Sequence, residues 1–459
     1  MSLRWAVLRG LAAVYAIAFV SFAVQALPLI GSRGIAPAAS LLAAAHQQFH
    51  FFDLPTLLWW NASDSAILAL SGLGVAAACA TLAGAWPRAA LAACWVFYLS
   101  IVNAGSVFMH YQWDALLLEA GLLAVLYAPR GWLPSRGVAP SPVAVFLMRW
   151  LLFRLMWLSG IVKLASGDPA WRSLRALDFH YFTQPLPPWT AYFMQLLPAW
   201  FQRASCVLMF AVELVLPVFI FAPWRVRRFA LVGIAALQLL ILATGNYGFF
   251  NLLALVLCGT LLVHEGQPAP PVPWRAALAW SFAALTIALT TNQALERFVG
   301  ETLLSRVAEP FAPLQSFNSY GLFSVMTTER REITLEGSVD GVHWQAYVFR
   351  YKPGALERWP RLVAPHMPRL DWQMWFASLG SCQQNRWFIA MMARLLEDPQ
   401  ALAPLFAQVP EAPPKFLRST IAPYRFTEWK EPGVWHAETS EPYCPQVTLQ
   451  DGRLVAVQD

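Results

Sequence analysis

The chain has 459 residues, of which 58% are hydrophobic and only 13% are charged, and its mean hydropathy is +0.48. A soluble domain of this size cannot bury so much apolar surface, so the composition excludes an ordinary soluble protein and makes the lipid bilayer a partner of the chain. The net charge of +6 does not indicate nucleic-acid binding, because residues 1–295 carry 16 Lys and Arg against 8 Asp and Glu, mostly at predicted helix ends, whereas residues 296–459 carry 16 against 18.

The first 295 residues contain nine apolar segments that are candidates for transmembrane helices. The first begins after the basic residue Arg4 like a signal peptide, but its apolar run is long enough to span, so we interpret it as a retained anchor. The predicted spans are Trp5–Ile30, Ala66–Trp86, Ala89–Met109, Tyr111–Tyr127, Val143–Ala165, Ser205–Phe221, Phe229–Ala243, Tyr247–Val263 and Trp274–Thr291.

Basic residues between these segments predict the orientation of the chain. If Arg4 lies inside, nine alternating crossings also place Arg88, Arg130, Arg228 and Arg275 inside, as the positive-inside rule requires. The external loops 31–65 and 166–204 and residues 296–459 then lie on the opposite side. That side is the periplasm if the membrane is a bacterial inner membrane, and the lumen if it is that of the endoplasmic reticulum. Loop 166–204 is rich in Pro and aromatic residues, which predicts short interfacial helices.

Beyond residue 310 the hydrophobic period changes and predicts a soluble, β-rich α+β domain over residues 296–459. Residues 332–337 and 344–351 are strand-like and flank the turn signal Asp340-Gly341. Short helices are predicted over residues 371–379, 387–396 and 399–407. A terminal hairpin is predicted over residues 446–457 around Asp451-Gly452. The fold class is therefore a polytopic helical membrane domain over residues 1–295 followed by this soluble domain.

Several polar residues fall within or beside the predicted spans, where a charge needs a partner, water or a function. His110 and Asp114 are four residues apart, so they could form a pair on one helix face or tie neighbouring helices together. Either Asp114 or Glu119 could pair with Arg149 or Arg154. Glu213 precedes Pro217 and is interpreted as part of a kinked helix, with a proton relay as the alternative.

Lys163 lies near the outer end of its predicted span, and His180 lies in the following external loop. A desolvated lysine can act as a base or nucleophile, and a histidine can act as an acid or base. The alternatives are that Lys163 snorkels or pairs with Asp168, and that His180 only forms hydrogen bonds within the loop. These two residues are the catalytic candidates if the protein is an enzyme.

The cysteines and the known catalytic motifs narrow the chemistry further. Cys79, Cys94, Cys206 and Cys258 lie in apolar runs, which leaves Cys382 and Cys444 as the candidates for a structural pair. The sequence has no Cys-x-x-Cys motif, nucleophile elbow, phosphate-binding loop, dinucleotide fingerprint or His-Glu-x-x-His motif, so it predicts no metal site and no cofactor. A secondary transporter has the right number of spans, but the chain has no inverted repeat that would indicate one.

Several strings in the chain resemble the signature of lipase maturation factors. In the first half they are Gly160-Ile161-Val162-Lys163-Leu164, Ser166-Gly167-Asp168, Trp171-Arg172, His180-Tyr181, Thr183-Gln184-Pro185-Leu186-Pro187, Gly245-Asn246-Tyr247 and Phe249-Phe250-Asn251. In the second half they are Asn318, Tyr320-Gly321-Leu322-Phe323, Glu336-Gly337-Ser338, Asp340-Gly341, Tyr351-Lys352-Pro353-Gly354 and Pro368-Arg369-Leu370-Asp371-Trp372-Gln373-Met374-Trp375-Phe376-Ala377. The match runs from about residue 100 to the end of the chain.

This resemblance implies a chaperone-like protein of the endomembrane system, whose client is a secreted lipase and whose large domain faces the lumen. It makes the matching residues candidates for client or substrate contact: Trp171, Arg172, Tyr181, Gln184, Asn246, Asn251, Asp371, Trp372, Trp375 and Phe376. Trp387 is a further aromatic candidate. The alternative interpretation of the aromatic residues is packing within the core.

A second, shorter resemblance covers about a dozen residues around Lys163. The segment Gly160-Ile161-Val162-Lys163-Leu164, which ends a predicted span and is followed by Trp171, is similar to part of vitamin K-dependent gamma-carboxylase. This likeness implies an alternative function, in which Lys163 is the base of an intramembrane enzyme acting on a lipid or quinone-like substrate.

Overall fold

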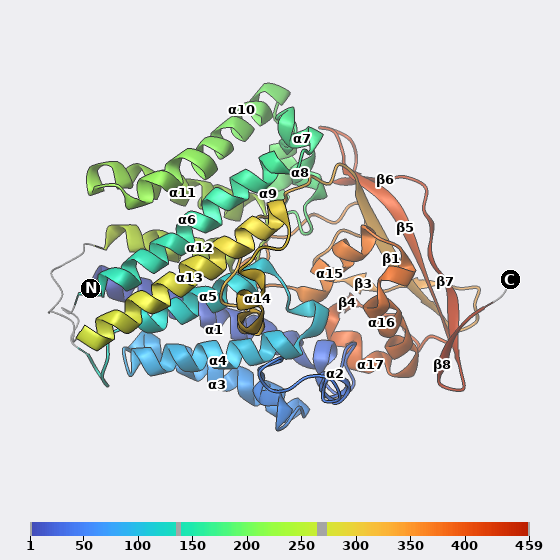
Figure 1. The fold of residues 1–459 in the computed structure, drawn as a ribbon. Coiled ribbons are helices and arrows are strands. Elements are labelled where there is room, and N and C mark those ends of the chain that lie inside the picture. The colour runs from blue at the N-terminus through green and yellow to red at the C-terminus, as the bar shows by residue number, and fades with distance from the viewer. Residues whose placement is uncertain (1, 135–138, 264–272, 458–459) are drawn as a thin grey trace.

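The computed structural model describes residues 2–134, 139–263 and 273–457. Figure 1 shows a bundle of long helices at the N-terminal side and a sheet at the C-terminal side, with the N-terminus and the C-terminus at opposite ends of the molecule. The long helices are α1 (Leu3–Ile30), α3 (Asp64–Ala83), α4 (Pro87–Ala104), α5 (Gln112–Tyr127), α6 (Pro142–Ala165), α10 (Ala199–Phe210), α11 (Trp224–Thr244), α12 (Phe250–Cys258) and α13 (Pro273–Val299).

Six helices of the described residues are long and apolar enough to cross a membrane. They are α1, α3, α4, α6, α11 and the continuous run Ala199–Phe221 that begins with α10. Their ends follow from local sequence. For example, the Ser63 hydroxyl accepts a hydrogen bond from Ala66 N at the start of α3, and Gly84 ends that helix at a φ of +88°, which glycine adopts without strain.

The run after α10 departs from α-helical geometry. Residues Ala211–Val215 form a π turn, η3, and Leu216–Phe221 form a 3-10 helix, η4. Pro217 lacks the N–H that an α-helix would need there, so the backbone changes its winding around this residue. The winding thus changes in the stretch that carries Glu213, where the sequence predicts a kinked helix.

Short helices connect the long ones, as the composition of loop 166–204 predicts for that segment. In that loop they are α7 (Pro169–Arg172), α8 (Leu177–Thr183) and α9 (Trp189–Gln195). The others are α2 (Ala38–Ala45) and α14 (Ser305–Ala308), with 3-10 turns η1 (Leu57–Trp59), η2 (Ser106–Phe108), η5 (Gly259–Leu262) and η6 (Glu309–Leu314).

The C-terminal region contains an antiparallel sheet with strand order β2-β1-β5-β7-β8, and β6 also pairs with β5. Its strands are β1 (Arg330–Ser338), β2 (Gln345–Ala346), β5 (Phe416–Phe426), β6 (Trp435–Ala437), β7 (Glu441–Gln450) and β8 (Arg453–Ala456). Ile333 pairs with Ile421 at the centre of the sheet. Beside it, β3 (Val348–Phe349) pairs with β4 (Phe406–Gln408), so the strand predicted over residues 344–351 is divided between two sheets.

Figure 1 shows helices of the C-terminal region lying between the sheet and the helical bundle. They are α15 (Arg369–Ser378), α16 (Arg386–Glu397) and α17 (Pro399–Leu402), with turns η7 (Cys382–Gln384) and η8 (Ala403–Leu405). One hydrophobic core includes Phe19 of α1, Leu116 of α5, Leu370 of α15 and Leu417 of β5. The two halves of the chain are thus packed on each other through a continuous apolar core.

Candidate functional site at the junction of the two halves

Lys163 forms a buried ion pair with Glu213. The Lys163 ammonium lies 2.8 Å from Oε1 and 2.7 Å from Oε2 of Glu213, and it also lies 5.4 Å from the centre of the Trp171 ring. The π turn of η3 carries Glu213 toward the end of α6, where Lys163 sits in the last turn. The lysine is therefore committed to a carboxylate of the neighbouring helical run.

Asp168 is not the partner of Lys163, contrary to one of the sequence-based alternatives. Its Oδ1 accepts hydrogen bonds from the backbone N–H groups of Ala170 and Trp171, which caps α7. Its Oδ2 accepts a hydrogen bond of 2.7 Å from Met326 N. Asp168 thus joins loop 166–204 to the C-terminal region.

A hydrogen-bonded chain of three side chains lies in the same region. The Tyr247 hydroxyl donates to Gln184 Oε1 over 2.9 Å and lies 3.3 Å from His180 Nε2. Because the single hydroxyl hydrogen is used by Gln184, His180 Nε2 is placed to donate to the Tyr247 oxygen. Burial, together with the positive charge of Lys163, lowers the pKa of His180 to about 4, so the imidazole is neutral at pH 7.

Other predicted contact residues are buried and hold backbone segments in place. Asn246 Oδ1 accepts from Val363 N and Ala364 N, and its amide donates to the carbonyls of Leu186 and Arg361. Asn251 is fully buried and donates to Gln238.

Asp371 is also buried, and it accepts from Tyr351 N and Lys352 N. Burial raises the pKa of Asp371 to about 6. None of Asn246, Asn251 and Asp371 reaches a surface where a client could touch it.

The aromatic contact candidates divide into buried and accessible groups. Trp171, Tyr181 and Trp372 are buried, and the Trp171 indole donates to Phe323 O over 2.8 Å. Trp375 is half-buried, and its indole donates to Thr183 O over 2.8 Å.

Trp387 is half-buried against Phe108. Phe376, with 42% of its surface exposed, and the exposed Arg172 are the predicted contact residues that are fully accessible.

The predicted pair between His110 and Asp114 does not form. The His110 side chain is exposed and its Nδ1 lies 2.8 Å from Ser106 O, because the helix α5 begins only at Gln112. Asp114 is fully buried and binds the Arg369 guanidinium at 2.8 Å and the Tyr98 hydroxyl at 2.5 Å. A carboxylate of the helical bundle is therefore neutralised by an arginine of the C-terminal region.

Glu119 is neutralised by Arg154 of α6, which is one of the pairings that the sequence leaves open. The Tyr320 hydroxyl also donates to Glu119 Oε2, over 2.7 Å, and Arg154 Nη1 donates to Asn318 O over 2.6 Å. Arg149 instead donates to backbone carbonyls, among them that of Val263 at 2.9 Å. The segment around residue 320 is thus fixed to α5 and α6 by buried polar contacts.

Ser21, Gln25, His366 and Met367 complete this junction, and the sequence analysis did not identify them. Ser21 Oγ accepts from Met367 N and lies 2.9 Å from His366 Nδ1, while Gln25 accepts from Arg369 N over 2.9 Å. The one available signal was that Ser21 and Gln25 are polar residues within an apolar first span, which need partners from elsewhere.

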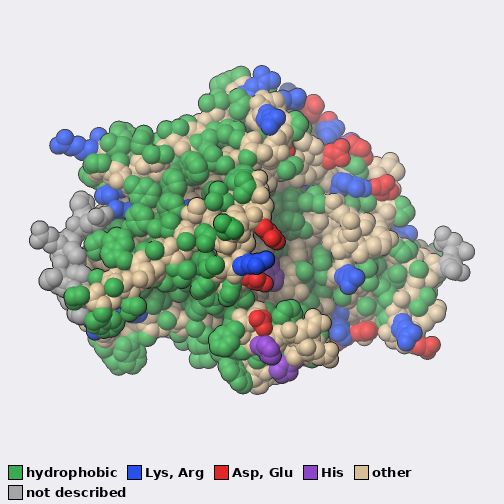
Figure 2. Space-filling view, in the orientation of Figure 1, with side chains coloured by type: hydrophobic (Ala, Val, Ile, Leu, Met, Phe, Trp, Pro, Cys, Tyr) green, Lys and Arg blue, Asp and Glu red, His purple; other side chains and the backbone are tan. Residues whose placement is uncertain are grey.

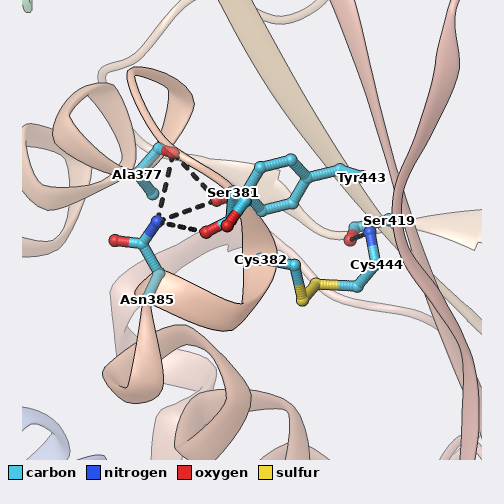
Figure 3. Close-up of a disulfide and its surroundings, with 7 residues drawn as sticks. All are labelled: Ala377, Ser381, Cys382, Asn385, Ser419, Tyr443 and Cys444. Atoms are coloured by element: carbon cyan, nitrogen blue, oxygen red, sulfur yellow. Dashed lines mark hydrogen bonds between the residues drawn. A yellow bond between two sulfur atoms is a disulfide. The ribbon is translucent and has the colours of Figure 1, made fainter.

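A disulfide joins Cys382 to Cys444 in the structure. Figure 3 shows it linking the turn before α16 to strand β7, beside Asn385 and Tyr443. The Tyr443 hydroxyl donates to Ala377 O over 2.8 Å, and Asn385 Nδ2 lies 3.0 Å from that hydroxyl. The disulfide and these hydrogen bonds fasten α15 and α16 to the sheet.

The described part of the chain contains no group of three or more His, Cys, Asp or Glu side chains that could hold a metal ion. The polar residues at the junction are instead paired with one another or with backbone groups. Their arrangement can hold the two halves together, and it leaves Arg172 and Phe376 free at the surface.

Comparison with known proteins agrees with this two-part architecture. A family model described as the lipase maturation factor transmembrane domain matches residues 2–267, and one described as the lipase maturation factor C-terminal domain matches residues 316–445. No solved structure is significantly similar to the chain.

Curated relatives match along nearly the whole chain. Lipase maturation factor 2 of Rattus norvegicus is 33% identical over 97% of this chain and 83% of its own length. Lipase maturation factor 2 of Homo sapiens is 32% identical over 97% of this chain and 83% of its own length. Lipase maturation factor 1 of Bos taurus is 34% identical over 98% of this chain and 90% of its own length. The chain is an integral membrane protein that belongs to the lipase maturation factor family.

Proposed function

We propose that the protein is a membrane-anchored maturation factor that helps secreted lipases reach their active, assembled form. The observation that carries this proposal is the likeness to lipase maturation factors through both the transmembrane and the C-terminal domain. The fold is compatible with it, because a soluble region is held firmly on a membrane bundle and exposes side chains beside the membrane.

The proposal includes nine membrane crossings. Three helices add to the six long apolar ones: α5, the short apolar run Phe250–Leu262 and α13. α5 packs between α4 and α6, and Trp150 of α6 donates to Thr290 of α13. Helices that pack against spanning helices lie at the same depth, and in the bilayer a helix satisfies its own backbone hydrogen bonds. This supports nine membrane crossings.

The proposed orientation places the C-terminal region on the secretory side. Figure 2 shows a broad hydrophobic band over the helical bundle, with basic side chains at its far end and mixed charges over the C-terminal region. Exposed Trp86, Trp132, Trp224 and Trp274 also lie at predicted inner ends of helices, as expected for an interfacial belt. The Cys382–Cys444 disulfide supports an oxidising compartment, either periplasm or lumen.

Cysteine labelling tests this orientation. In a Cys79→Ala background expressed in a bacterial inner membrane, a membrane-impermeant maleimide should label Val342→Cys in intact spheroplasts and should label Arg228→Cys only after permeabilisation. Both positions are exposed. The reverse pattern would exclude the proposed orientation.

The domain division at about residue 296 is part of the same proposal. The two family matches end at residue 267 and begin at residue 316, so they flank this boundary. Client contact is proposed for the accessible residues Arg172 and Phe376, together with the half-buried Trp375. Trp375 lies where loop 166–204 meets α15, because its indole donates to Thr183 O.

The gamma-carboxylase alternative has no support from the comparisons, and Lys163 is held by Glu213. Substitution of Lys163 nevertheless separates the two functions. Arginine keeps the charge and can pair with Glu213, but it cannot serve as a base at neutral pH. A maturation factor should therefore tolerate Lys163→Arg, whereas an enzyme that uses Lys163 as a base should not.

The test is co-expression of a secreted lipase from the same genome with the wild type, a deletion, Lys163→Arg and Phe376→Ala. Lipase activity and lipase amount are both measured. We expect a loss of specific activity in the deletion, retention in Lys163→Arg and a partial loss in Phe376→Ala. Trp429→Ala, at another exposed aromatic of the C-terminal region, is the control. Normal lipase activity in the deletion would reject the proposed function.

A further inference from the structure

A polar cavity of about 320 Å³ lies where α13 leaves the bundle. Its wall is formed by Gln112 and Ala115 of α5, by Gln293, Glu296 and Arg297 of α13, and by residues 318–320. Figure 2 shows a hollow between the helical bundle and the C-terminal region, with acidic and basic side chains at its rim.

Glu296 and Arg297 line this cavity, and neither forms an ion pair with another described residue. Glu296 Oε1 accepts from Asn292 Nδ2 over 2.8 Å and from the Ser305 hydroxyl, but Oε2 forms no hydrogen bond within the described residues. The Arg297 guanidinium donates to the carbonyls of Tyr320 and Ser319 at 3.3 and 3.2 Å, and no described carboxylate is paired with it.

A third polar group is also left without a partner. Ser319 lines the same cavity, and its hydroxyl oxygen is buried in the cavity wall without any hydrogen bond to the described residues. Buried hydroxyl groups are seldom left without a partner. The cavity is therefore lined by an anion-binding guanidinium and a carboxylate oxygen, with an unsatisfied hydroxyl in its wall.

On the nine-span topology proposed above, the surroundings place this cavity at the edge of the bilayer. It lies at the outer end of α13, and the chain that follows exposes Leu303 over 98% of its surface, with Leu304 and Val307 also exposed. On α13 itself, Leu295 and Phe298 are exposed beside the charged pair. Large apolar side chains next to charged ones are typical of the interface between acyl chains and headgroups.

We propose that this cavity binds the phosphoethanolamine headgroup of a bilayer lipid. Arg297 would bind the phosphate, Glu296 Oε2 would accept from the primary ammonium, and the acyl chains would follow Leu295 and Phe298. The cavity volume fits a headgroup and not a whole lipid. This inference does not depend on the identity of the client, because the cavity is separate from Arg172 and Phe376.

The charges of Glu296 and Arg297 also predict which lipid headgroup the cavity prefers. A phosphocholine headgroup has no ammonium hydrogen to donate to Glu296, and a phosphoglycerol headgroup leaves the Glu296 charge without a cation. Phosphoethanolamine satisfies both charges at once.

The experiment is native mass spectrometry of the full chain after reconstitution into nanodiscs with equal amounts of the three lipid classes. We expect the phosphoethanolamine lipid to be retained several-fold above its share. Arg297→Gln should remove this enrichment. Glu296→Gln, which keeps the size of the side chain, should shift retention toward the phosphoglycerol lipid. Arg306→Gln, at an exposed arginine of α14 outside the cavity, should retain the wild-type preference.

Addition of soluble glycerophosphoethanolamine distinguishes a lipid from a free headgroup. If glycerophosphoethanolamine displaces the lipid only at a large excess, the cavity is a lipid site. If the soluble compound displaces the lipid fully at a concentration equal to that of the lipid, the ligand is a water-soluble compound and the proposal is overturned. The proposal is rejected if the wild type retains all three lipids equally. It is also rejected if the folded Arg297→Gln and Glu296→Gln proteins keep the wild-type selectivity. Thermal unfolding of each variant in the same detergent verifies its fold.

Discussion

The ion pair between Lys163 and Glu213 has only small exposure, 6% and 7% of the side chains. A buried pair adds little net stability compared with apolar residues of the same size, but the loss of one partner leaves a charge without compensation. The role of Lys163 as a structural cation can therefore be separated experimentally from a chemical role.

We expect Lys163→Met to destabilise the protein by about 3–5 kcal/mol, because Glu213 stays buried and unpaired. The double variant Lys163→Met with Glu213→Met should recover much of that loss, and Lys163→Arg should be close to the wild type. Thermal unfolding in detergent measures these proteins together with the single variant Glu213→Met, which completes the double-mutant cycle. Additive losses in the double variant would show that the two side chains are not coupled.

His366, at the junction of the two halves, makes the stability of the folded protein depend on pH. Burial, reinforced by the positive charge of Arg369, lowers the pKa of His366 to about 4 from an ordinary value of 6.5. Because the folded-state pKa is depressed, the stabilising contribution is complete above pH 6.5 and is lost as the pH falls from 6.5 toward 4.

We therefore expect the wild type to lose about 2 kcal/mol from this histidine between pH 7.5 and pH 5. His366→Gln should be less sensitive to acid by that amount, since glutamine cannot gain a proton. Thermal midpoints of the two proteins at both pH values give the difference. His436→Gln, at an exposed histidine of β6, serves as the control and should behave as the wild type.

At the scale of elements, patterns within one segment were predictable and pairings between distant segments were not. The strand at Glu332, the helix at Trp387 and the hairpin at Asp451-Gly452 follow from local periodicity and turn residues. β5 was not predicted, because Pro423 and the buried Ser419 interrupt its apolar alternation. Its central place in the sheet comes from pairing with both β1 and β7.

The candidate site shows the same division. The sequence indicated that Glu119 and Asp114 need partners, because carboxylates at membrane depth are costly. It did not reveal that Arg369 is the partner of Asp114, since 255 residues separate them. Pro217 indicated an irregular helix around Glu213, but the local sequence did not reveal that Lys163, 50 residues away, is the partner of Glu213.

The disulfide is the element-scale link that we expect to matter most for the C-terminal region. Its two cysteines are 62 residues apart. A cross-link that closes a loop of that length lowers the conformational entropy of the unfolded chain. This stabilises the folded state by about 4 kcal/mol. The Cys382→Ser and Cys444→Ser double variant should therefore unfold this region at lower temperature.

Limited proteolysis during a temperature ramp, with and without reductant, measures the effect. Reduction should lower the unfolding temperature of the wild type toward that of the double variant and leave the variant unchanged. Cys79→Ser, at an exposed free cysteine, is the control. A double variant as stable as the oxidised wild type would contradict the expected role.

At the scale of the whole molecule, the two halves are joined by buried charges as well as by apolar packing. The Arg369 guanidinium reaches Asp114 and the carbonyl of Phe108, and both ends of the pair are 1% exposed. An exposed ion pair on the same region, Arg394 with Glu397, contributes far less, because both groups remain hydrated.

We expect Arg369→Met to weaken the attachment of the C-terminal region by about 3–5 kcal/mol, because Asp114 loses its cation. The released region should become sensitive to protease near residues 354–366, and Asp114→Asn in the same chain should restore part of the protection. Arg394→Gln is the matched control. Equal protease sensitivity of Arg369→Met and the control would show that the apolar core alone holds the halves together.

The contacts of Ser21 and Gln25 with residues 366–369 also impose an order on biosynthesis. α1 is synthesised long before residues 366–369, so its polar side chains acquire these partners only after some 340 further residues have been translated. Until then, Ser21 and Gln25 lack their long-range hydrogen bonds, and only the bond from Gln25 to the Ser21 carbonyl can form within the helix. The last contacts of α1 therefore form only when the C-terminal region folds against it.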